Sequence, residues 1–486
     1  MSEKNLINIV GRRNVVHRPK VLEEYSRDSS FAPRIRPRCI VRPGNAEEVQ
    51  AIVRWANETL TPLIPISSGP PHSRGDTVPG RGGTVIVDLS RMKRIMRIDP
   101  KNRVVMVEPG VTFTELQPEL EKAGLYAYMP LSPRSSKSVI SSMLEREPIT
   151  MPSHHWDCTD PMLCAEIIFG TGDKLRSGEA AGPDTVEEQW EMGKVQMAPF
   201  GPGQFDPNRL VSGAQGTIGI ITWATLKCRF SSKLNSTILV TSDSIDQLID
   251  LSYQLIRRRL GDNCFILNDL NLACLLGQTR QEIEELRTIL PPWILVVSFE
   301  GYGALPEEKI QYQEADLRDM AQSCYLETKT LIPGASAEDL SVLLSQPSPE
   351  PYWKLRFTGG YHDIFFLTTM DKTPEFITAM STLAQSQNFT TKDIGVYIQM
   401  AVQGTSCHCE FCLYSDLTQP AEFERTKWLV TEGSKEFAKM GGFFSRPYGA
   451  WANFAYGPTG QTVITQRKVK EIFDPNYILN PGKLCF

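Results

Sequence analysis

Residues 66–79, ISSGPPHSRGDTVP, have the composition of a loop that binds phosphate groups. A diphosphate needs a close approach of the backbone and several free N–H donors, and a loop rich in glycine and serine provides both when it follows a strand. The apolar run at residues 62–66 predicts such a strand. An ordinary tight turn contains the same residue types, so the loop alone leaves both interpretations open.

A second group of residues that could do chemistry is the soft-ligand cluster Cys407, His408, Cys409 and Cys412. On a strand, Cys407 and Cys409 face one side, whereas His408, Glu410 and Cys412 face the other. One metal ion cannot easily collect ligands from both faces, and no second cluster of cysteine and histidine is near in sequence. We therefore expect buried thiols and no metal site here, with metal binding as the less favoured alternative.

The elements that must position these residues begin with residues 1–230. Asn45 is placed to cap a helix over residues 46–60, where the apolar residues have helical spacing. Two further strands and a helix capped by Thr112 are expected at residues 84–89, 104–107 and 112–123. This alternation of strands and helices, joined by glycine-rich turns, indicates a mixed α/β arrangement.

The middle region, residues 231–455, has a different pattern. Helices are expected at residues 245–258 and 281–289, and strands at residues 293–299, 364–369, 396–402 and 409–414. Strands near both ends with helices between them indicate an antiparallel sheet that is covered on one face. A helix at residues 463–473 lies in the last segment, residues 456–486, which we expect to return to the first domain.

Composition excludes several classes of protein. The chain of 486 residues has 41% hydrophobic and 22% charged residues, a balance typical of globular proteins. A net charge of −5 and a pI of about 5.9 argue against a nucleic-acid partner. No apolar run approaches the ~20 residues of a membrane span. Without a signal-like stretch near the N-terminus we expect a cytoplasmic protein, in which the 11 cysteines are reduced.

Several segments together resemble the vanillyl-alcohol oxidase and p-cresol methylhydroxylase (PCMH) superfamily. These are the loop at residues 66–79, the following VIVDLSRMKRIMRID and VEPG, and then SVISSMLEREP, CAEIIFGTGDKLRSG, RLVSGAQGTIGIITWATLKC and FDPNYILNPGKLCF. The resemblance implies FAD as the cofactor and an α+β fold. It further implies a two-part PCMH-type FAD-binding domain at residues 1–230 and a substrate domain at residues 231–455, whose antiparallel sheet is covered by helices.

The same resemblance implies which residues bind FAD. They are Ser67, Ser68, Gly69, Pro70, Pro71, His72, Gly75 and Asp76 of the loop, and Pro130, Ser138, Ser141, Ser142, Gly216, Gly219 and Ile221 further along the chain. The loop departs from the superfamily's run of glycines at Pro70 and Pro71, and proline has no N–H to donate. Some members link FAD covalently through a histidine of this loop. The register of His72 differs by one residue, so we expect FAD to be held without a covalent bond.

Three segments resemble substrate-site motifs of the superfamily. His154 and Asp157 lie in HHWD, which resembles a stretch of the phenol-oxidising branch whose aspartate assists catalysis. Arg356 ends WKLR, which resembles the carboxylate-binding motif of the D-2-hydroxyacid branch. Arg446 and Tyr448 lie in SRPY, where the phenol-oxidising branch holds a phenolate. A guanidinium fork suits either a carboxylate or a phenolate. The alternative interpretations are a surface turn for HHWD and structural ion pairs for the arginines.

These segments predict an FAD-dependent oxidoreductase that removes hydride from an alcohol or benzylic carbon of a small anionic substrate, of the 4-hydroxybenzylic or aryl-alcohol type. Arg356 or Arg446 would anchor the anion, and His154, Asp157, Tyr397 or Tyr448 would handle the proton. The alternatives are a D-2-hydroxyacid dehydrogenase acting on lactate or glycolate, an electron-transfer subunit of a larger redox complex, and a non-catalytic flavin-binding protein. The electron acceptor, with a redox protein among the candidates, and homo-oligomerisation stay open.

Overall fold

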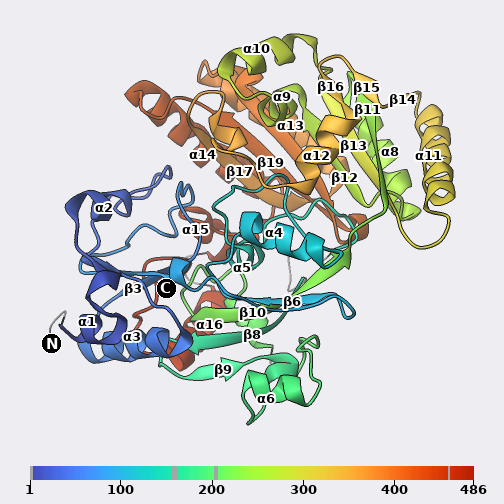
Figure 1. Ribbon diagram of the computed structural model, residues 1–486. Coiled ribbons are helices and arrows are strands. Elements are labelled where there is room, and N and C mark those ends of the chain that lie inside the picture. The colour runs from blue at the N-terminus through green and yellow to red at the C-terminus, as the bar shows by residue number, and fades with distance from the viewer. Residues whose placement is uncertain (1–3, 155–160, 202–205, 458–459) are drawn as a thin grey trace.

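The computed structural model describes residues 4–154, 161–201, 206–457 and 460–486. The strands form two units, a first one with two sheets and a second one with a large sheet, and the second lies above the first in Figure 1. The helices of the first unit are α1 Lys4–Val10, α2 Pro19–Glu24, α3 Ala46–Thr59, α4 Phe113–Lys122, α5 Val139–Leu144, α6 Val186–Glu191 and α7 Pro207–Val211.

A four-stranded sheet carries the loop at residues 66–79. Its order is β1-β2-β4-β3, with β1 Val15–Val16, β2 Cys39–Val41, β3 Leu63–Ile66 and β4 Val85–Asp88, and β4 is parallel to both β2 and β3. Helix α3 connects β2 to β3, and the predicted cap is confirmed because the Asn45 side chain accepts from the Glu48 N–H at 2.8 Å. The loop therefore leaves the carboxyl end of a buried parallel strand.

The second sheet supports the rest of the first unit. Its strands are β5 Ile95–Asp99, β6 Val104–Val107, β8 Met162–Phe169, β9 Lys174–Arg176 and β10 Gly219–Phe230, with β7 Leu125–Ala127 paired to β10. Helix α4 packs on it, and Thr112 forms the expected cap as part of a capping box with Glu115. This sheet fixes the two ends of the segment that contains α5.

A seven-stranded antiparallel sheet forms the second unit, in the order β14-β11-β13-β12-β18-β19-β17. Its strands are β11 Leu234–Ser242, β12 Asn263–Asn268, β13 Trp293–Gly301, β14 Thr328–Lys329, β17 Tyr361–Thr368, β18 Ile394–Ala401 and β19 Ser406–Tyr414, and β15 Leu331–Ile332 pairs with β16 Ala335–Ser336 beside it. The four strands predicted in this region are confirmed. The α+β class is confirmed as well.

Helices cover this sheet on both faces, which corrects the expectation of a single covered face. One apolar cluster joins the sheet to α8 Ile245–Arg257, α11 Pro306–Ser323, α13 Thr373–Ser386 and α14 Pro420–Lys439. A second cluster joins the other face to α9 Asp269–Leu276, α10 Arg280–Ile289 and α12 Ala337–Ser345. Strands buried on both faces are apolar almost throughout, as in β18, whose eight residues are all buried.

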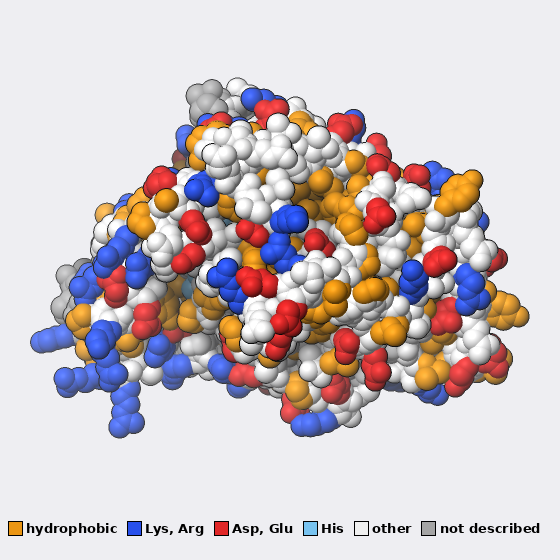
Figure 2. All heavy atoms as spheres, turned by 90° about the horizontal axis from the view of Figure 1, so that it is seen from above, with side chains coloured by type: hydrophobic (Ala, Val, Ile, Leu, Met, Phe, Trp, Pro, Cys, Tyr) orange, Lys and Arg blue, Asp and Glu red, His pale blue; other side chains and the backbone are white. Residues whose placement is uncertain are grey.

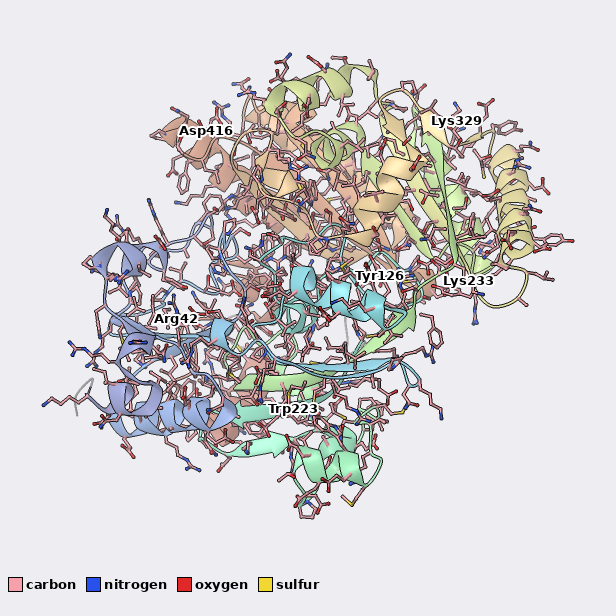
Figure 3. All side chains as sticks on the ribbon, in the orientation of Figure 1. Arg42, Tyr126, Trp223, Lys233, Lys329 and Asp416 are labelled. Carbon is pink, nitrogen blue, oxygen red and sulfur yellow. The ribbon has the colours of Figure 1, made fainter. Side chains whose placement is uncertain are left out.

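Side chains of the first unit reach the second at their junction, where Figure 3 labels Tyr126 and Lys233. The Tyr126 hydroxyl donates to the Leu344 carbonyl at 3.1 Å. The guanidinium of Arg229 lies 4.4 Å from the Tyr126 ring centroid and pairs with Glu300 of β13. These contacts fix the orientation of the large sheet relative to the first unit.

The last residues pack against the first unit. They include α16 Gln461–Phe473, and the chain then runs beside β3, where Leu63 N–H donates to Ile478 O at 2.7 Å. The preceding helix α15 Trp451–Tyr456 packs on the second unit instead, because Trp451 Nε1 donates to Ser434 Oγ of α14 at 2.8 Å. Within α16, Lys470 is fully buried and pairs with Asp474. These contacts support the division at residues 230 and 455, which stays our proposal.

Acidic and basic side chains are interspersed over most of the face seen in Figure 2, whereas Lys and Arg side chains gather at its lower left edge. Among the described residues, no helix combines the length and the apolar character that a membrane span requires.

Candidate active site

A cavity lies between the two units and is lined by residues of both. The space not filled by atoms, including the part open to solvent, is about 1570 Å³. The loop at residues 66–79 and residues 130–148 and 211–221 line one end, whereas β17, β18 and β19 contribute to the other. Both units thus contribute side chains to one continuous cavity.

The loop at residues 66–79 turns some of its residues toward the cavity and others away. Ser67, Ser68, His72 and Asp76 line the cavity, whereas Gly69, Pro70, Pro71 and Gly75 are outside its lining. Gly69 N–H donates to Ser136 O at 2.9 Å, and Gly75 N–H donates to Asp28 Oδ2 at 2.7 Å. Gly75 has a φ of 77°, a conformation that favours glycine. The glycines thus shape the loop through contacts on its far side.

The cavity side of this loop suits an anionic group. The backbone N–H groups of Ser67, Ser68 and His72 have no hydrogen-bond acceptor in the part of the chain that the structure describes. Arg134 and Lys137 also line the cavity here. Burial, assisted by the positive charge of Arg134, lowers the pKa of His72 to about 3, so its imidazole is neutral. Free N–H donors beside two cations fit the diphosphate of a dinucleotide.

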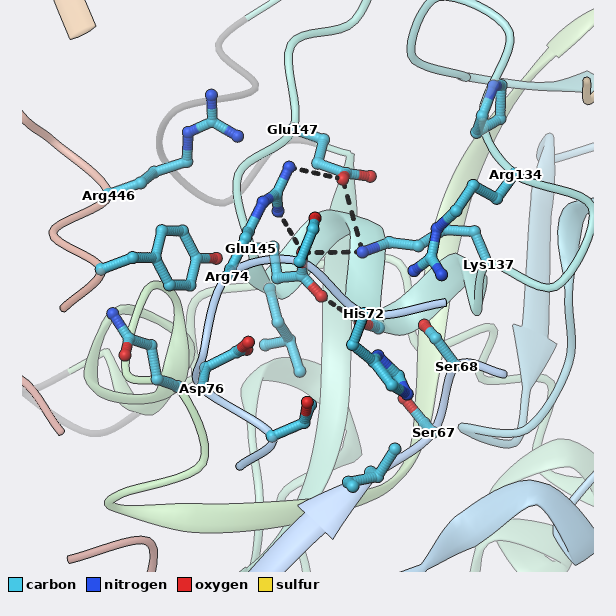
Figure 4. A pocket seen from close by; sticks show the side chains of 18 of the residues that line it. Ser67, Ser68, His72, Arg74, Asp76, Arg134, Lys137, Glu145, Glu147 and Arg446 are labelled. Carbon is cyan, nitrogen blue, oxygen red and sulfur yellow. Dashed lines mark hydrogen bonds and ion pairs between the residues drawn. The ribbon is translucent and has the colours of Figure 1, made fainter. Parts of the chain in front are cut away.

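A compact network of ion pairs lies next to the loop (Figure 4). Arg74 pairs with Glu145 and, at 3.1 Å, with Glu147. Lys137 pairs with the same carboxylates at 2.7 Å and 3.4 Å. Burial opposes ionisation of the glutamates, yet Lys137 and Arg74 hold the pKa of each below its usual value. The network is therefore charged on all four members and balanced in charge.

The segments after the loop complete this end of the cavity. Pro130, Ser141, Gly216, Gly219 and Ile221 line it, whereas Ser138 and Ser142 are not in its lining. Ser138 instead caps α5, and the Ser142 hydroxyl donates to Glu147 at 2.8 Å. A Cβ on Gly216 would approach the Pro65 ring to 2.6 Å, so glycine is needed for the close packing of two cavity segments.

The end of the cavity that the second unit contributes is rich in aromatic side chains and contains a buried arginine, which Arg74 of the loop approaches. Its lining includes Tyr352, Trp353, Tyr361, Tyr397 and Tyr448. Arg446 is 3% exposed, and its Nη1 has no hydrogen-bond partner among the described residues. Burial, with repulsion from Arg74 as the next cause, lowers the pKa of Arg446 to about 10, so it stays charged at neutral pH. This end offers a cation and flat apolar walls.

Lys354 and two carboxylates form a second charged group at this end. Lys354 Nζ lies 2.9 Å from Asp363 Oδ2 and 2.6 Å from Glu410 Oε1. Atoms of Asp363, Glu410 and Cys412 lie within 4.8 Å of one another, a spacing that could hold a metal ion. In the structure the Lys354 ammonium pairs with both carboxylates and so occupies the place that a metal ion would take. As predicted from strand alternation, Cys407 and Cys409 pack in one core cluster, whereas Cys412 packs in the cluster on the other face.

Comparisons with known proteins agree with this geometry. Residues 37–163 match a family model described as an FAD binding domain. The chain is 24% identical to the D-lactate dehydrogenase of Anaerostipes hadrus over 98% of this chain and 96% of that protein. The solved structure of p-cresol methylhydroxylase with substrate bound is similar with a TM-score of 0.86 at 18% identity, covering 99% of this chain and 96% of that one.

The chain has the PCMH-type FAD-binding fold of the vanillyl-alcohol oxidase superfamily. A second member of this fold, the 4-ethylphenol oxidase of Gulosibacter chungangensis, gives a TM-score of 0.81 at 18% identity, covering 99% of this chain and 95% of that one. The resemblance found in the sequence is thus confirmed, and so is FAD as the cofactor. The chain is an FAD-linked oxidoreductase.

The structure separates the substrate-site residues expected from the superfamily motifs. Tyr397, Arg446 and Tyr448 line the cavity together. Arg356 is outside the lining, because its guanidinium donates to backbone carbonyls, including Pro351 O at 2.9 Å and Gly277 O at 3.2 Å. His154 packs against the Tyr128 ring at 4.2 Å and is also outside the lining. Asp157 lies outside the described residues.

Other charged residues of the PCMH-type cavity were not predicted from the sequence. They are Arg74, Arg134, Lys137, Glu145, Glu147, Lys354, Asp363 and Glu410. Arg74, Glu145 and Glu147 lie in segments that resemble the superfamily, but the resemblance assigns no role to them. A single signal was available, since Arg74 lies inside the phosphate-binding loop itself.

Proposed function

We propose that this FAD-linked oxidoreductase removes hydride from an alcohol or benzylic carbon of a small anionic substrate, of the 4-hydroxybenzylic or aryl-alcohol type. The single observation that carries the proposal is Arg446, a buried cation at the aromatic end of the cavity whose Nη1 has no hydrogen-bond partner among the described residues. Leaving a charge buried without a partner is costly. An anionic substrate would relieve that cost.

The cofactor would be held at the other end. We assign its diphosphate to the free N–H groups of Ser67, Ser68 and His72, beside Arg134 and Lys137. The bound cofactor supplies the hydride-accepting chemistry. The protein contributes position and charge on both sides of the cavity.

An aromatic substrate is supported by the aromatic side chains that line the cavity beside Arg446, among them Tyr397 and Tyr448. The guanidinium Cζ lies 3.9 Å from the centroid of the Phe365 ring, which fixes the plane of the fork. Burial raises the pKa of both Tyr397 and Tyr448 well above the ordinary value, so both phenols are protonated at neutral pH. As O–H donors they suit an anionic oxygen better than they suit the role of proton acceptor. Of the other two residues expected to handle the proton, His154 lies outside the cavity lining, so we propose Asp157, which is not among the described residues, as the proton acceptor.

Oxidation of a D-2-hydroxyacid is the second candidate function. The full-length similarity to a D-lactate dehydrogenase supports it. The position of Arg356 argues against it, because the fork that this alternative would use for a carboxylate is already occupied by backbone carbonyls. An electron-transfer role would require partner subunits that co-purify with the chain.

Anaerobic bleaching of the flavin absorbance tests the proposal. The purified protein, loaded with FAD, is mixed with 4-hydroxybenzyl alcohol, 4-(hydroxymethyl)benzoate, D-lactate and D-2-hydroxyglutarate. We expect bleaching by an aromatic alcohol, and we expect Arg446→Lys to slow it about tenfold or more, because a hydrogen bond to a charged group contributes ~1.5–3 kcal/mol. Bleaching by the hydroxyacids alone would favour the second candidate, and a fully active Arg446→Lys variant would remove the anchor.

A further inference from the structure

Two arginines from distant parts of the chain meet on one aromatic ring. The Cζ atoms of Arg446 and Arg74 lie 3.9 Å and 5.4 Å from the centroid of the Phe365 ring. Arg74 also lies 5.3 Å from the ring centroid of Tyr448. Figure 4 shows that the two arginines approach this part of the cavity from different segments, Arg74 from the loop and Arg446 from the C-terminal region.

The charges of the two arginines are balanced unequally. Arg74 is paired with both Glu145 and Glu147. Arg446 forms no ion pair among the described residues, and its Nη2 contact is to His408 Nδ1 at 3.4 Å. Repulsion from Arg74 contributes to the lowered pKa of Arg446. Of the two guanidinium groups on this ring, only that of Arg446 therefore lacks a directly bonded carboxylate among the described residues, and an anion bound there would supply one.

His408 helps to leave one edge of Arg446 available. Its Nε2 faces Glu410 Oε2 at 3.2 Å, so a proton on Nε2 is donated to the carboxylate and Nδ1 accepts from Arg446. Lys354 holds the other oxygen of Glu410. This chain of contacts orients Arg446 with Nη2 toward the sheet, while Nη1 finds no partner in the described part of the chain.

We propose that Arg74 and Arg446 together clamp a carboxylate group of the substrate, which makes an aryl alcohol or benzylic compound carrying a carboxylate the substrate class. The inference rests on the proposed function, in which Arg446 binds the anion. Arg74 gives one N–H of each terminal nitrogen to Glu145 and Glu147, so a second N–H on each has no acceptor among the described residues, whereas all five donors of Arg356 are engaged. A carboxylate has two oxygens for the two guanidinium groups, whereas a phenolate has a single oxygen. Arg74 thereby becomes a binding residue that belongs to the cofactor loop and also reaches the substrate.

Ligand binding to the FAD-loaded protein tests the clamp without turnover. Benzoate and its neutral analogue benzamide are titrated, and the perturbation of the flavin spectrum gives each Kd. We expect the wild-type protein to bind benzoate about tenfold or more tightly than benzamide, because the charge adds to the same ring contact. The absence of such a preference, or no binding of benzoate, would overturn the clamp even if no variant could be purified.

Two variants of Arg74, compared with Arg446→Lys and with one control, then separate the two arginines. Arg74→Lys keeps the charge and loses the fork, whereas Arg74→Met combined with Glu147→Gln keeps the charge balance of the network. We expect both to raise the Kd of benzoate about tenfold and to change that of benzamide little. Arg280→Met is the control, since its side chain is 67% exposed on α10.

The outcomes distinguish this proposal from the one it rests on. If Arg446→Lys weakens benzoate binding and the Arg74 variants do not, the anion binds to Arg446 alone and only the clamp is wrong. If neither arginine affects benzoate binding, the proposed function loses its anchor as well. Equal weakening of benzoate and benzamide by the Arg74 variants would show an effect of cavity shape and would also overturn the clamp.

Discussion

At the scale of single residues, Arg356 shows how a buried guanidinium can serve the backbone instead of a ligand. Its donors reach carbonyl oxygens of Pro349, Pro351, Leu275 and Gly277. Arg356→Lys leaves several of these carbonyls without a donor. We expect the free energy of unfolding in urea to fall by about 2 kcal/mol, with KM unchanged. If Arg356→Lys instead raised KM and left the stability unchanged, Arg356 would be a substrate-binding residue.

Asp76 gives a prediction about pH. Burial, with repulsion from Glu145 as the next cause, raises its pKa from 3.8 to about 6. The folded FAD-free protein therefore binds this proton more tightly than the unfolded chain, so the stability contribution is complete below pH 3.8 and is lost as pH rises through about 6. The loss is at most about 3 kcal/mol. Thermal melts should show that Asp76→Asn raises the Tm of the FAD-free protein at pH 7.5 but not at pH 4; equal shifts at both pH values would contradict this.

The sequence predicted some residues of the cavity lining and missed others, and the residue types explain the difference. Tyr397, Arg446 and Tyr448 line the cavity as expected, and the loop residues Ser67 and Ser68 do too. Lys137, Glu145, Glu147, Lys354 and Glu410 are indistinguishable in sequence from charged residues on a solvated face. Their role depends on burial between two units, which no local pattern encodes.

At the scale of elements, helix caps were the most reliable signals. Thr112 begins α4 with a reciprocal capping box, in which its hydroxyl and the Glu115 carboxylate each satisfy a backbone N–H of the other residue. We expect Thr112→Ala to lower the free energy of unfolding by about 1 kcal/mol in urea. Thr382→Ala, in the exposed middle of α13, is the control and should change stability little. An equal effect of both substitutions would mean that the cap contributes nothing.

Other elements were harder to predict. The strands β17, β18 and β19 were expected within a few residues of their observed bounds, because they are apolar runs between turns. Helices α9 and α14 were not expected. The run in α9 is apolar on nearly all sides, since six of its eight residues are buried, so no amphipathic period marks it. The two-sided cover of the sheet follows from such helices.

At the scale of the whole molecule, the cofactor should be FAD and should be released intact by acid. The neutral His72, with its pKa near 3, lies in the lining of the cavity, and we expect no covalent bond to it. After acid precipitation of the yellow protein, the flavin should appear in the supernatant as FAD and not as FMN. Flavin that stays with the precipitate in the wild type and is released in His72→Ala would demonstrate the bond that we do not expect.

The segment after α16 also completes the cofactor loop. Asn480 Nδ2 donates to Asp76 O at 2.9 Å and to Gln215 O at 2.7 Å, and Lys483 Nζ donates to Gly75 O at 2.6 Å. The ribosome makes these residues only after it has made the entire second unit. In the nascent chain, the first unit therefore lacks these hydrogen bonds to its cofactor loop until the large sheet has been synthesised. We expect cofactor loading to be a late event of biosynthesis that follows the folding of the second unit.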